Sequence, residues 1–162
     1  MKGSIYLDTN ILVALYEGRL GVHGALWEFM NVAIEEKNIT FHTSAMSFSE
    51  LLVKPYRDRD EPLTRHYLQL AKSEDWLIVE AVTPIVIETS AAIRATSRLR
   101  LPDSFHLATA MSSECNYFLT FDLGINSMSD LQHPISGKPA GRPVEVVRPD
   151  AASLFELSKA LS

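Results

Sequence analysis

SIYLDTNILVALYEG, residues 4–18, is the segment from which the fold class of this chain can be inferred. Its first four residues, 4–7, are apolar enough for a short buried strand, and residues 11–17 have the spacing of a helix. Gly18 follows that helix, and glycine is common at helix ends. Asp8 stands directly after the strand. We therefore expect a strand followed closely by a helix, with a carboxylate at the carboxyl end of the strand.

The rest of the chain continues this alternation of strands and helices. Further strands are expected at residues 38–42, 76–82, 117–121 and 144–147. Helices are expected at residues 22–37, 47–56, 62–73, 83–100, 103–115 and 150–161, with Thr83-Pro84 opening the fourth and Asp150 capping the last. This order predicts an α/β sandwich with a mostly parallel central sheet. We expect one domain over residues 1–162, with an irregular loop at 124–143 and a terminal strand and helix at 144–161.

Composition limits the compartment and the mode of ligand binding. Hydrophobic residues make up 46% of the chain and charged residues 22%, which is ordinary for a soluble globular protein. The single cysteine, Cys115, can form no internal disulfide, and we find neither a signal-peptide pattern nor an uncharged apolar run of ~18 residues. We therefore expect a cytoplasmic protein without a membrane span. The net charge of −5 argues against nucleic-acid binding through a broadly basic surface, so such contact would be local or would pass through a metal ion.

Acidic residues follow two of the predicted strands. Asp8 comes after the first strand, and Asp122 comes after the strand at 117–121. A parallel sheet binds ligands at the carboxyl ends of its strands, so these two acids should lie on the same edge. Asp103 opens a predicted helix, and Glu50 lies in the first turn of another. If both helix starts face that edge, four carboxylates converge.

Such a cluster of four acids needs a cation. Two carboxylates about 5 Å apart repel by roughly 3 kcal/mol at an effective dielectric constant of 20, so either some are protonated or a cation neutralises them. Mg²⁺ and Mn²⁺ prefer oxygen ligands, and no histidine or cysteine spacing here suggests zinc. Asn10 and Thr120 each lie two residues from an acid and could orient a water molecule or a carboxylate.

Each acid also has an ordinary structural interpretation. Asp8 could cap the first helix, Asp103 could cap its own helix, and Asp122 could begin a turn. Glu50 is the fourth residue of Ser47-Phe48-Ser49-Glu50, which matches a capping box. The functional interpretation depends on the set of four, two of them at strand ends.

Four segments resemble the motifs of the PIN-domain family. Residues 5–10 (IYLDTN) resemble its opening, residues 101–110 (LPDSFHLATA) its third-acid motif, and residues 118–122 (FLTFD) its closing strand. Glu50, in the segment SELL at 49–52, matches the second acid in order and setting. The resemblance covers roughly residues 4–126 and points in particular to VapC-type toxin ribonucleases of toxin–antitoxin systems.

This resemblance implies a three-layer α/β/α fold and cleavage of RNA with Mg²⁺ or Mn²⁺, as one or two ions. It makes Asp8, Glu50, Asp103 and Asp122 both the catalytic residues and the metal ligands. It also implies a homodimer and inhibition by a small antitoxin protein. Two features depart from the family pattern: the segment at 124–143 is unusually long, and Phe121 stands where a polar residue often precedes the fourth acid.

Basic and histidine residues supply further candidates. Two basic clusters, at 54–65 and 94–100, could touch RNA phosphates through Arg57, Arg94 and Arg98, although both could equally be solvated helix faces. His106 lies one turn after Asp103 and could face the site, but a packing or helix-surface role is the favoured interpretation.

Three functions fit these observations. The leading hypothesis is a metal-dependent endoribonuclease that serves as the toxin of a type II toxin–antitoxin pair. The alternative is a catalytically silent PIN-type scaffold that binds RNA or protein, although four intact acids argue against it. A third is an aspartyl phosphatase with Asp8 as its nucleophile, but such enzymes usually need a second aspartate two residues on, where this chain has Asn10.

Overall fold

A parallel β-sheet forms the centre of the molecule. The computed structural model describes residues 3–18 and 23–161, and in this part of the chain five strands pair in the order β3-β2-β1-β4-β5. Every pairing between neighbours is parallel, which confirms the predicted sheet. The strands are β1 (Gly3–Leu7), β2 (Ile39–Ser44), β3 (Leu77–Glu80), β4 (Tyr117–Leu119) and β5 (Glu145–Val147).

The central strand β1 is buried on both faces. Ile5, Tyr6 and Leu7 are each fully inaccessible to solvent. Ile5 and Leu7 belong to one hydrophobic cluster, and Tyr6 belongs to the other together with Phe118 of β4. A continuous apolar run is what a strand covered on both faces requires, because successive side chains point to opposite sides.

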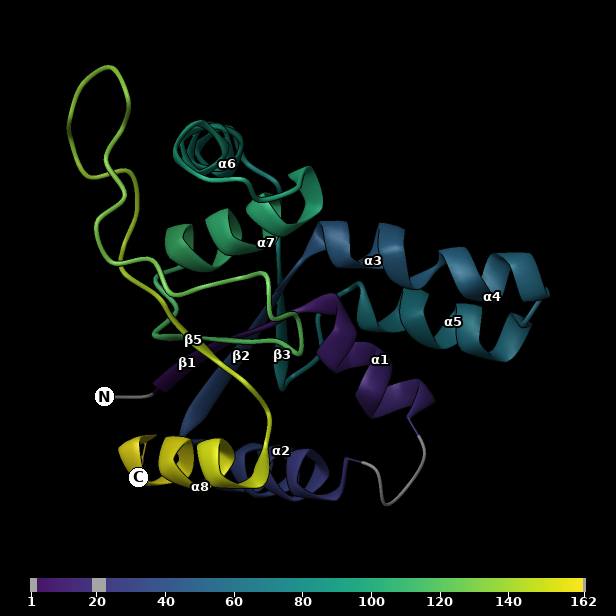
Figure 1. Cartoon of the computed structure of the whole chain (residues 1–162). Helices are drawn as coiled ribbons and strands as arrows, with labels where there is room; N and C mark the ends of the chain where they lie inside the picture. The colour runs from purple at the N-terminus through teal and green to yellow at the C-terminus, as the bar shows by residue number, and fades with distance from the viewer. Residues whose placement is uncertain (1–2, 19–22, 162) are drawn as a thin grey trace.

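Helices cover both faces of the sheet. In Figure 1, α6 and α7 lie above the sheet, while α2 and α8 lie below it. Three layers result, which confirms the α/β/α class. The helices are α1 (Thr9–Glu17), α2 (Gly24–Glu36), α3 (Ala45–Leu51), α4 (Val53–Asp58), α5 (Glu61–Leu70), α6 (Pro84–Thr96), α7 (Leu101–Ser112) and α8 (Ala151–Leu161). The predicted start of the second helix at Val22 lies outside the described residues.

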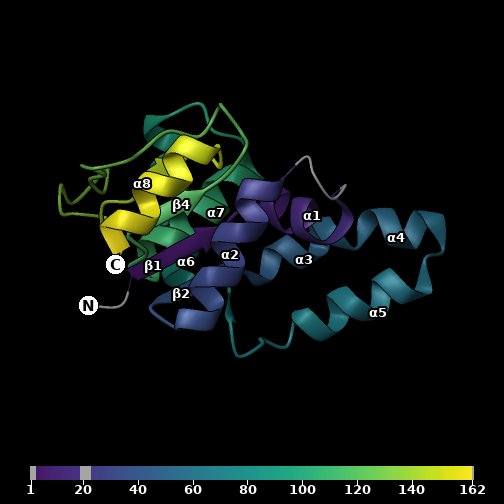
Figure 2. The ribbon, with the colours of Figure 1, turned by 90° about the horizontal axis from the view of Figure 1, so that it is seen from below.

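The region after β2 differs from the single helix predicted at 47–56. Two short helices, α3 and α4, take its place, and α4 with α5 forms an arm that extends beyond the sheet (Figures 1 and 2). The helix begins earlier than predicted because Ser44, rather than Ser47, is its cap: the Ser44 hydroxyl accepts the Met46 backbone N–H at 3.2 Å. The chain breaks near Leu52 because Pro55 has no N–H to donate to the preceding turn.

The α6–α7 connection also shifts two predicted boundaries. α6 begins after Thr83 as predicted, but it ends at Thr96 instead of Arg100. α7 begins at Leu101, not at Asp103, and Arg100 is its N-cap residue. Proline at the second helical position is tolerated because its missing N–H would have had no helical partner. Asp103 therefore lies inside the first turn of α7.

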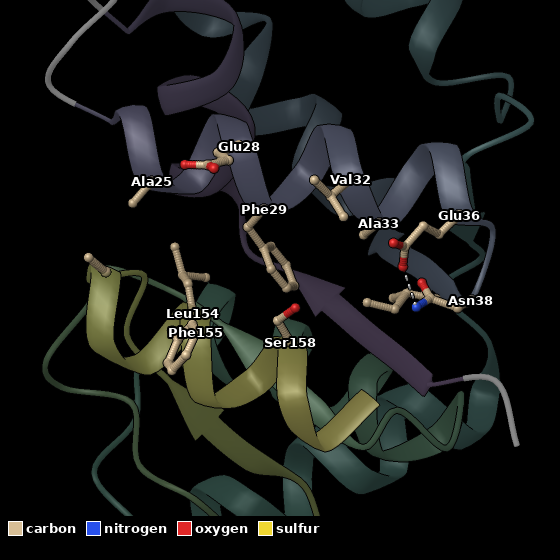
Figure 3. Close-up of a pocket in the computed structure, with 12 residues that line it drawn as sticks. Ala25, Glu28, Phe29, Val32, Ala33, Glu36, Asn38, Leu154, Phe155 and Ser158 are labelled. Atoms are coloured by element: carbon tan, nitrogen blue, oxygen red, sulfur yellow. Dashed lines mark hydrogen bonds between the residues drawn. The ribbon is translucent and has the colours of Figure 1, made fainter. Parts of the chain in front are cut away.

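The C-terminal part of the chain agrees with its prediction. Residues 124–143 contain no helix or strand of the main sheet, and Asp150 caps α8 by accepting the Ser153 backbone N–H at 2.9 Å. α8 packs beside α2, where Phe29 of α2 and Leu154 and Phe155 of α8 line a shallow apolar groove (Figure 3). Within the described ranges, no helix is long and apolar enough to cross a membrane.

Candidate active site

Asp8 is a buried carboxylate held at the edge of the sheet. It follows β1 and caps α1, with its Oδ1 accepting the Thr9 backbone N–H at 2.8 Å. Its Oδ2 accepts the Thr120 hydroxyl at 2.6 Å and the Asn10 side-chain amide at 2.9 Å. Burial raises the pKa of Asp8, although these hydrogen bonds and nearby His106 act in the opposite direction. The capping interpretation of this residue is therefore confirmed, and its role in a site stays a prediction.

Asn10 and Thr120, predicted as orienting residues, join the ends of β1 and β4. The Asn10 amide donates to the Thr120 hydroxyl at 3.0 Å and accepts the Phe121 backbone N–H at 3.1 Å. The Thr120 hydroxyl also accepts the Asp122 backbone N–H at 2.9 Å. This network fixes the segment that carries Asp122 relative to Asp8. Because the network saturates Asp8 Oδ2, it also sets the direction in which that carboxylate points.

Glu50 reaches the same region from an unpredicted position. It lies in the last turn of α3, not in the first turn of a helix, so both the first-turn placement and the capping-box interpretation are wrong. Its Oε2 accepts the Thr9 hydroxyl and His106 Nε2, the latter at 2.9 Å. Burial opposes ionisation, but these hydrogen bonds outweigh it and hold the pKa of Glu50 below its ordinary value.

His106 is a buried link between the sheet and Glu50. Its ring is only 1% exposed, and its Nδ1 lies 2.7 Å from the Tyr6 hydroxyl. That hydroxyl accepts the Ser44 backbone N–H at 3.0 Å, so its own proton is available to Nδ1. In the neutral ring, Nε2 then carries the proton and donates it to Glu50. Burial raises the pKa of Tyr6 well above its ordinary value, which keeps the phenol protonated for this role.

The sequence favoured either a packing role or a helix-surface role for His106, and the helix-surface role is wrong. The residue is buried against the sheet, and it is bonded to one of the four predicted acids. Its position three residues after Asp103 placed it on the same face of the helix, and this spacing was the available signal.

Asp103 and Asp122 share a basic partner, Arg100, which was not among the three arginines singled out from the sequence. Arg100 donates from Nε to Asp103 Oδ2 at 2.9 Å, and its Nη2 lies 3.6 Å from Asp122 Oδ2. The Gly124 backbone N–H donates to Asp122 Oδ1 at 2.7 Å. The contacts of Arg100 with the two aspartates raise its pKa above the ordinary value, with Asp103 as the main cause. Only the clustering of arginines before Asp103 hinted at this contact.

The four predicted acids therefore lie in one region but in two groups. Asp8 and Glu50 are joined through Thr9, while Asp103 and Asp122 are joined through Arg100. Glu50 contributes to the pKa shifts of both Asp8 and Arg100, so the two groups are electrostatically linked.

The donor set fits a hard divalent cation by its chemistry. All four acids offer carboxylate oxygens, which Mg²⁺ and Mn²⁺ prefer. As the side chains stand, however, no three acidic, histidine or cysteine residues of the described chain are placed to hold one metal ion. Each carboxylate already has partners, and Arg100 holds two of them.

The three arginines predicted to touch RNA lie apart from the acids. Arg57 is in the last turn of α4, on the projecting arm, and Arg94 is in the last turn of α6. Arg98 follows α6 in the connection to α7. All three are exposed, and among the described residues none forms an ion pair with the four acids. Their role in RNA binding stays a prediction.

Comparisons with known proteins bear on the family and the fold. A family model described as "PIN domain" matches residues 5–131. A toxin–antitoxin complex from Klebsiella pneumoniae is similar in structure, with a TM-score of 0.58, 24% identity, and coverage of 90% of this chain and 98% of that chain. VapBC2 from Rickettsia felis, solved bound to a DNA fragment from their promoter, gives a TM-score of 0.60, 13% identity, and coverage of 88% and 98%.

A third similar structure is FitAcB from Neisseria gonorrhoeae, with a TM-score of 0.56, 18% identity, and coverage of 74% of this chain and 88% of that chain. No curated protein sequence gave a significant match. At these identities the solved structures establish a shared fold.

Proposed function

Since the chain belongs to the PIN domain family, we propose that it is a cytoplasmic, Mg²⁺- or Mn²⁺-dependent endoribonuclease and the toxin of a type II toxin–antitoxin pair. The observation that carries this proposal is the position of Asp8. The residue is only 6% exposed, and burial raises the pKa of its carboxyl group at an edge that also bears Glu50, Asp103 and Asp122. A carboxylate with this environment is a candidate for a functional site, because placing it there costs stability.

The chain's own residues would hold and orient the ligand set. Asp8, Glu50, Asp103 and Asp122 are the proposed ligands, and a bound divalent ion would polarise a phosphodiester and activate water. Asn10 and Thr120 fix Asp8, and His106 fixes Glu50 through a proton on Nε2. We expect each of these three to orient a carboxylate without itself contacting the reacting phosphate.

Cleavage of labelled single-stranded RNA by the purified full chain tests the proposal. We expect activity with Mg²⁺ or Mn²⁺, none with excess chelator, and a loss of more than about 100-fold in Asp8→Asn. The magnitude follows because losing a residue that only orients a metal ligand already costs about 10–100-fold. Asp75→Asn is the matched control, because Asp75 is an exposed aspartate in the turn before β3.

Two results would overturn the nuclease proposal. One is full activity in the chelator, and the other is an Asp8→Asn variant as active as Asp75→Asn. Calorimetric titration with Mn²⁺ adds a readout that does not depend on the RNA chosen. If the folded wild type bound no Mn²⁺ and cleaved no RNA, the catalytically silent scaffold would be the better description.

The toxin role adds partners to the proposal. Two of the similar structures are a toxin–antitoxin complex and VapBC2, and these support a protein antitoxin as partner. A homodimer is also proposed, and exposed apolar side chains on the arm, such as Val53, Tyr56 and Leu68, offer surface for it. Induced expression should arrest bacterial growth for the wild type but not for Asp8→Asn, and light scattering would give the oligomeric state.

RNA contact by the exposed arginines completes the proposal. Arg57, Arg94 and Arg98 have no ion-pair partners among the described residues that would compete with a phosphate. Replacing any of them should weaken RNA binding and flatten its dependence on salt, since each phosphate contact releases counterions.

A further inference from the structure

Arg100 is the cation that contacts the acidic site. Of the lysine and arginine residues described by the structure, it is the one that forms an ion pair with any of the four proposed ligands. Its guanidinium spans Asp103 at 2.9 Å and Asp122 at 3.6 Å, while 76% of its side chain stays exposed. An exposed charge placed over two carboxylates neutralises them without being buried itself.

The backbone of Arg100 is fixed, although most of its side chain is exposed. Its carbonyl accepts the Ser104 backbone N–H at 3.0 Å, which is the first hydrogen bond of α7. Pro102 further restricts the backbone of Leu101, the residue between Arg100 and Pro102. The guanidinium can therefore swing on its three-carbon stem while its Cα remains beside Asp103.

A divalent ion would compete with this guanidinium for the same oxygens. Mg²⁺ binds carboxylate oxygens at 2.0–2.1 Å, so an ion on Asp103 Oδ2 or Asp122 Oδ2 would displace the arginine nitrogens now facing those atoms. Like charges about 5 Å apart repel even in water, and for an ion of charge two this lowers affinity by roughly tenfold. The absence of a ready three-ligand site among the described side chains agrees with this competition.

We propose that Arg100 is a built-in cation of the metal-free site, which releases Asp103 and Asp122 when the metal binds and then contacts a phosphate of the RNA strand. This inference rests on the proposed function. The planar guanidinium suits such an exchange, because its donors match a phosphate as well as a carboxylate. In a chain with a net charge of −5, a cation at the rim of the acidic site would also provide local attraction for RNA.

Opposite effects on two ligands test the proposal. Arg100→Gln should bind Mn²⁺ about 3- to 10-fold more tightly in calorimetry of the RNA-free full chain, because the competing charge is gone. In the Asp8→Asn background, which keeps Asp103 and Asp122, the same substitution should weaken binding of a fluorescent single-stranded RNA at saturating Mn²⁺ about 3- to 10-fold. The salt dependence of RNA binding should also fall by about one released counterion.

For the Mn²⁺ titration, Arg98→Gln is the matched control; it is not a control for RNA binding, because Arg98 is itself a proposed RNA contact. This substitution removes the same charge two residues away, from an exposed side chain with no contact to the acids among the described residues. We expect its Mn²⁺ affinity to stay within about twofold of the wild type. Arg100→Lys keeps the charge but loses the planar guanidinium that can donate two parallel hydrogen bonds. Its Mn²⁺ affinity should therefore remain near that of the wild type while its RNA affinity falls.

The outcomes separate this inference from the proposed function. Wild-type Mn²⁺ binding with an unchanged or weaker affinity in Arg100→Gln overturns the role of Arg100 and leaves the metal-dependent nuclease intact. Tighter Mn²⁺ binding with unchanged RNA binding overturns the phosphate contact. If neither wild type nor Arg100→Gln bound Mn²⁺, the proposed function would fail, and the inference about Arg100 would fail with it.

Discussion

Removal of the Tyr6 hydroxyl tests the hydrogen-bonded chain that ends at Glu50. Tyr6 is fully buried, and its hydroxyl serves both the Ser44 backbone N–H at 3.0 Å and His106 Nδ1 at 2.7 Å. Tyr6→Phe keeps the ring and leaves both of these groups without a partner. Each buried polar group that loses its partner costs about 1–3 kcal/mol, so the free energy of unfolding should fall by about 2–6 kcal/mol.

Urea denaturation followed by circular dichroism measures this loss. With a dependence on urea of about 2 kcal/mol per M, the midpoint should fall by about 1–3 M at an unchanged slope. Tyr16→Phe is the matched control, because the Tyr16 hydroxyl is only partly buried and has no hydrogen-bond partner among the described residues. Its midpoint should move by less than about a quarter of that amount.

Tyr6→Phe should also lower RNA cleavage at the proposed active site. Without the Tyr6 hydroxyl as a donor to Nδ1, the His106 ring can adopt either tautomer, and Glu50 loses a defined donor. RNA cleavage should fall about 10-fold or more under conditions where the variant is fully folded. If Tyr6→Phe were no less stable than Tyr16→Phe, the buried chain from Ser44 to Glu50 would be refuted.

Two further substitutions test the network around Asp8 and the cap of α8. Thr120→Val, which keeps the side-chain shape but removes the hydroxyl bonded to Asp8 and Asn10, should lower cleavage about 10- to 100-fold and destabilise the chain by about 1–3 kcal/mol. Thr120→Ser should restore both properties in the same assays, and a Val variant with wild-type activity would contradict this role. Backbone and side-chain hydrogen bonds from Ser153 lower the pKa of Asp150 from its ordinary value of 3.8. Ionised Asp150 therefore stabilises the fold above pH 3.8. This contribution to stability is lost as the pH falls through the lowered pKa. The melting temperature of Asp150→Asn should therefore lie below that of the wild type at pH 7, and the difference should shrink below pH 3.8; a constant difference would contradict the shift.

Short-range patterns were sufficient for the sheet and for the residues at its strand ends. The apolar run before Asp8 and the segment before Asp122 predicted parallel strands, because only a strand covered on both faces is apolar without alternation. Asn10 and Thr120 were also predictable, since residues two positions from a strand-end acid remain near it in any arrangement of the sheet.

Helix boundaries were less predictable because neighbouring residues compete for the cap. Ser44 and Ser47 both have the chemistry of a cap, and only the end of β2 decides that Ser44 fills this role. Glu50 therefore lies in the last turn of α3, and not in the first turn of a helix as predicted. A proline at the second position likewise let α7 begin before Asp103.

Contiguous residues were enough to predict the parallel α/β core and the two acids at its strand ends, because both follow from the period and polarity of neighbouring positions. The contacts of His106 with Glu50, 56 residues away in the chain, and with Tyr6, 100 residues away, arise from the folded arrangement alone. The same arrangement brings Arg100 to Asp122 as well as to Asp103. Such contacts depend on the strand order and on which face each helix covers, and no local pattern encodes either.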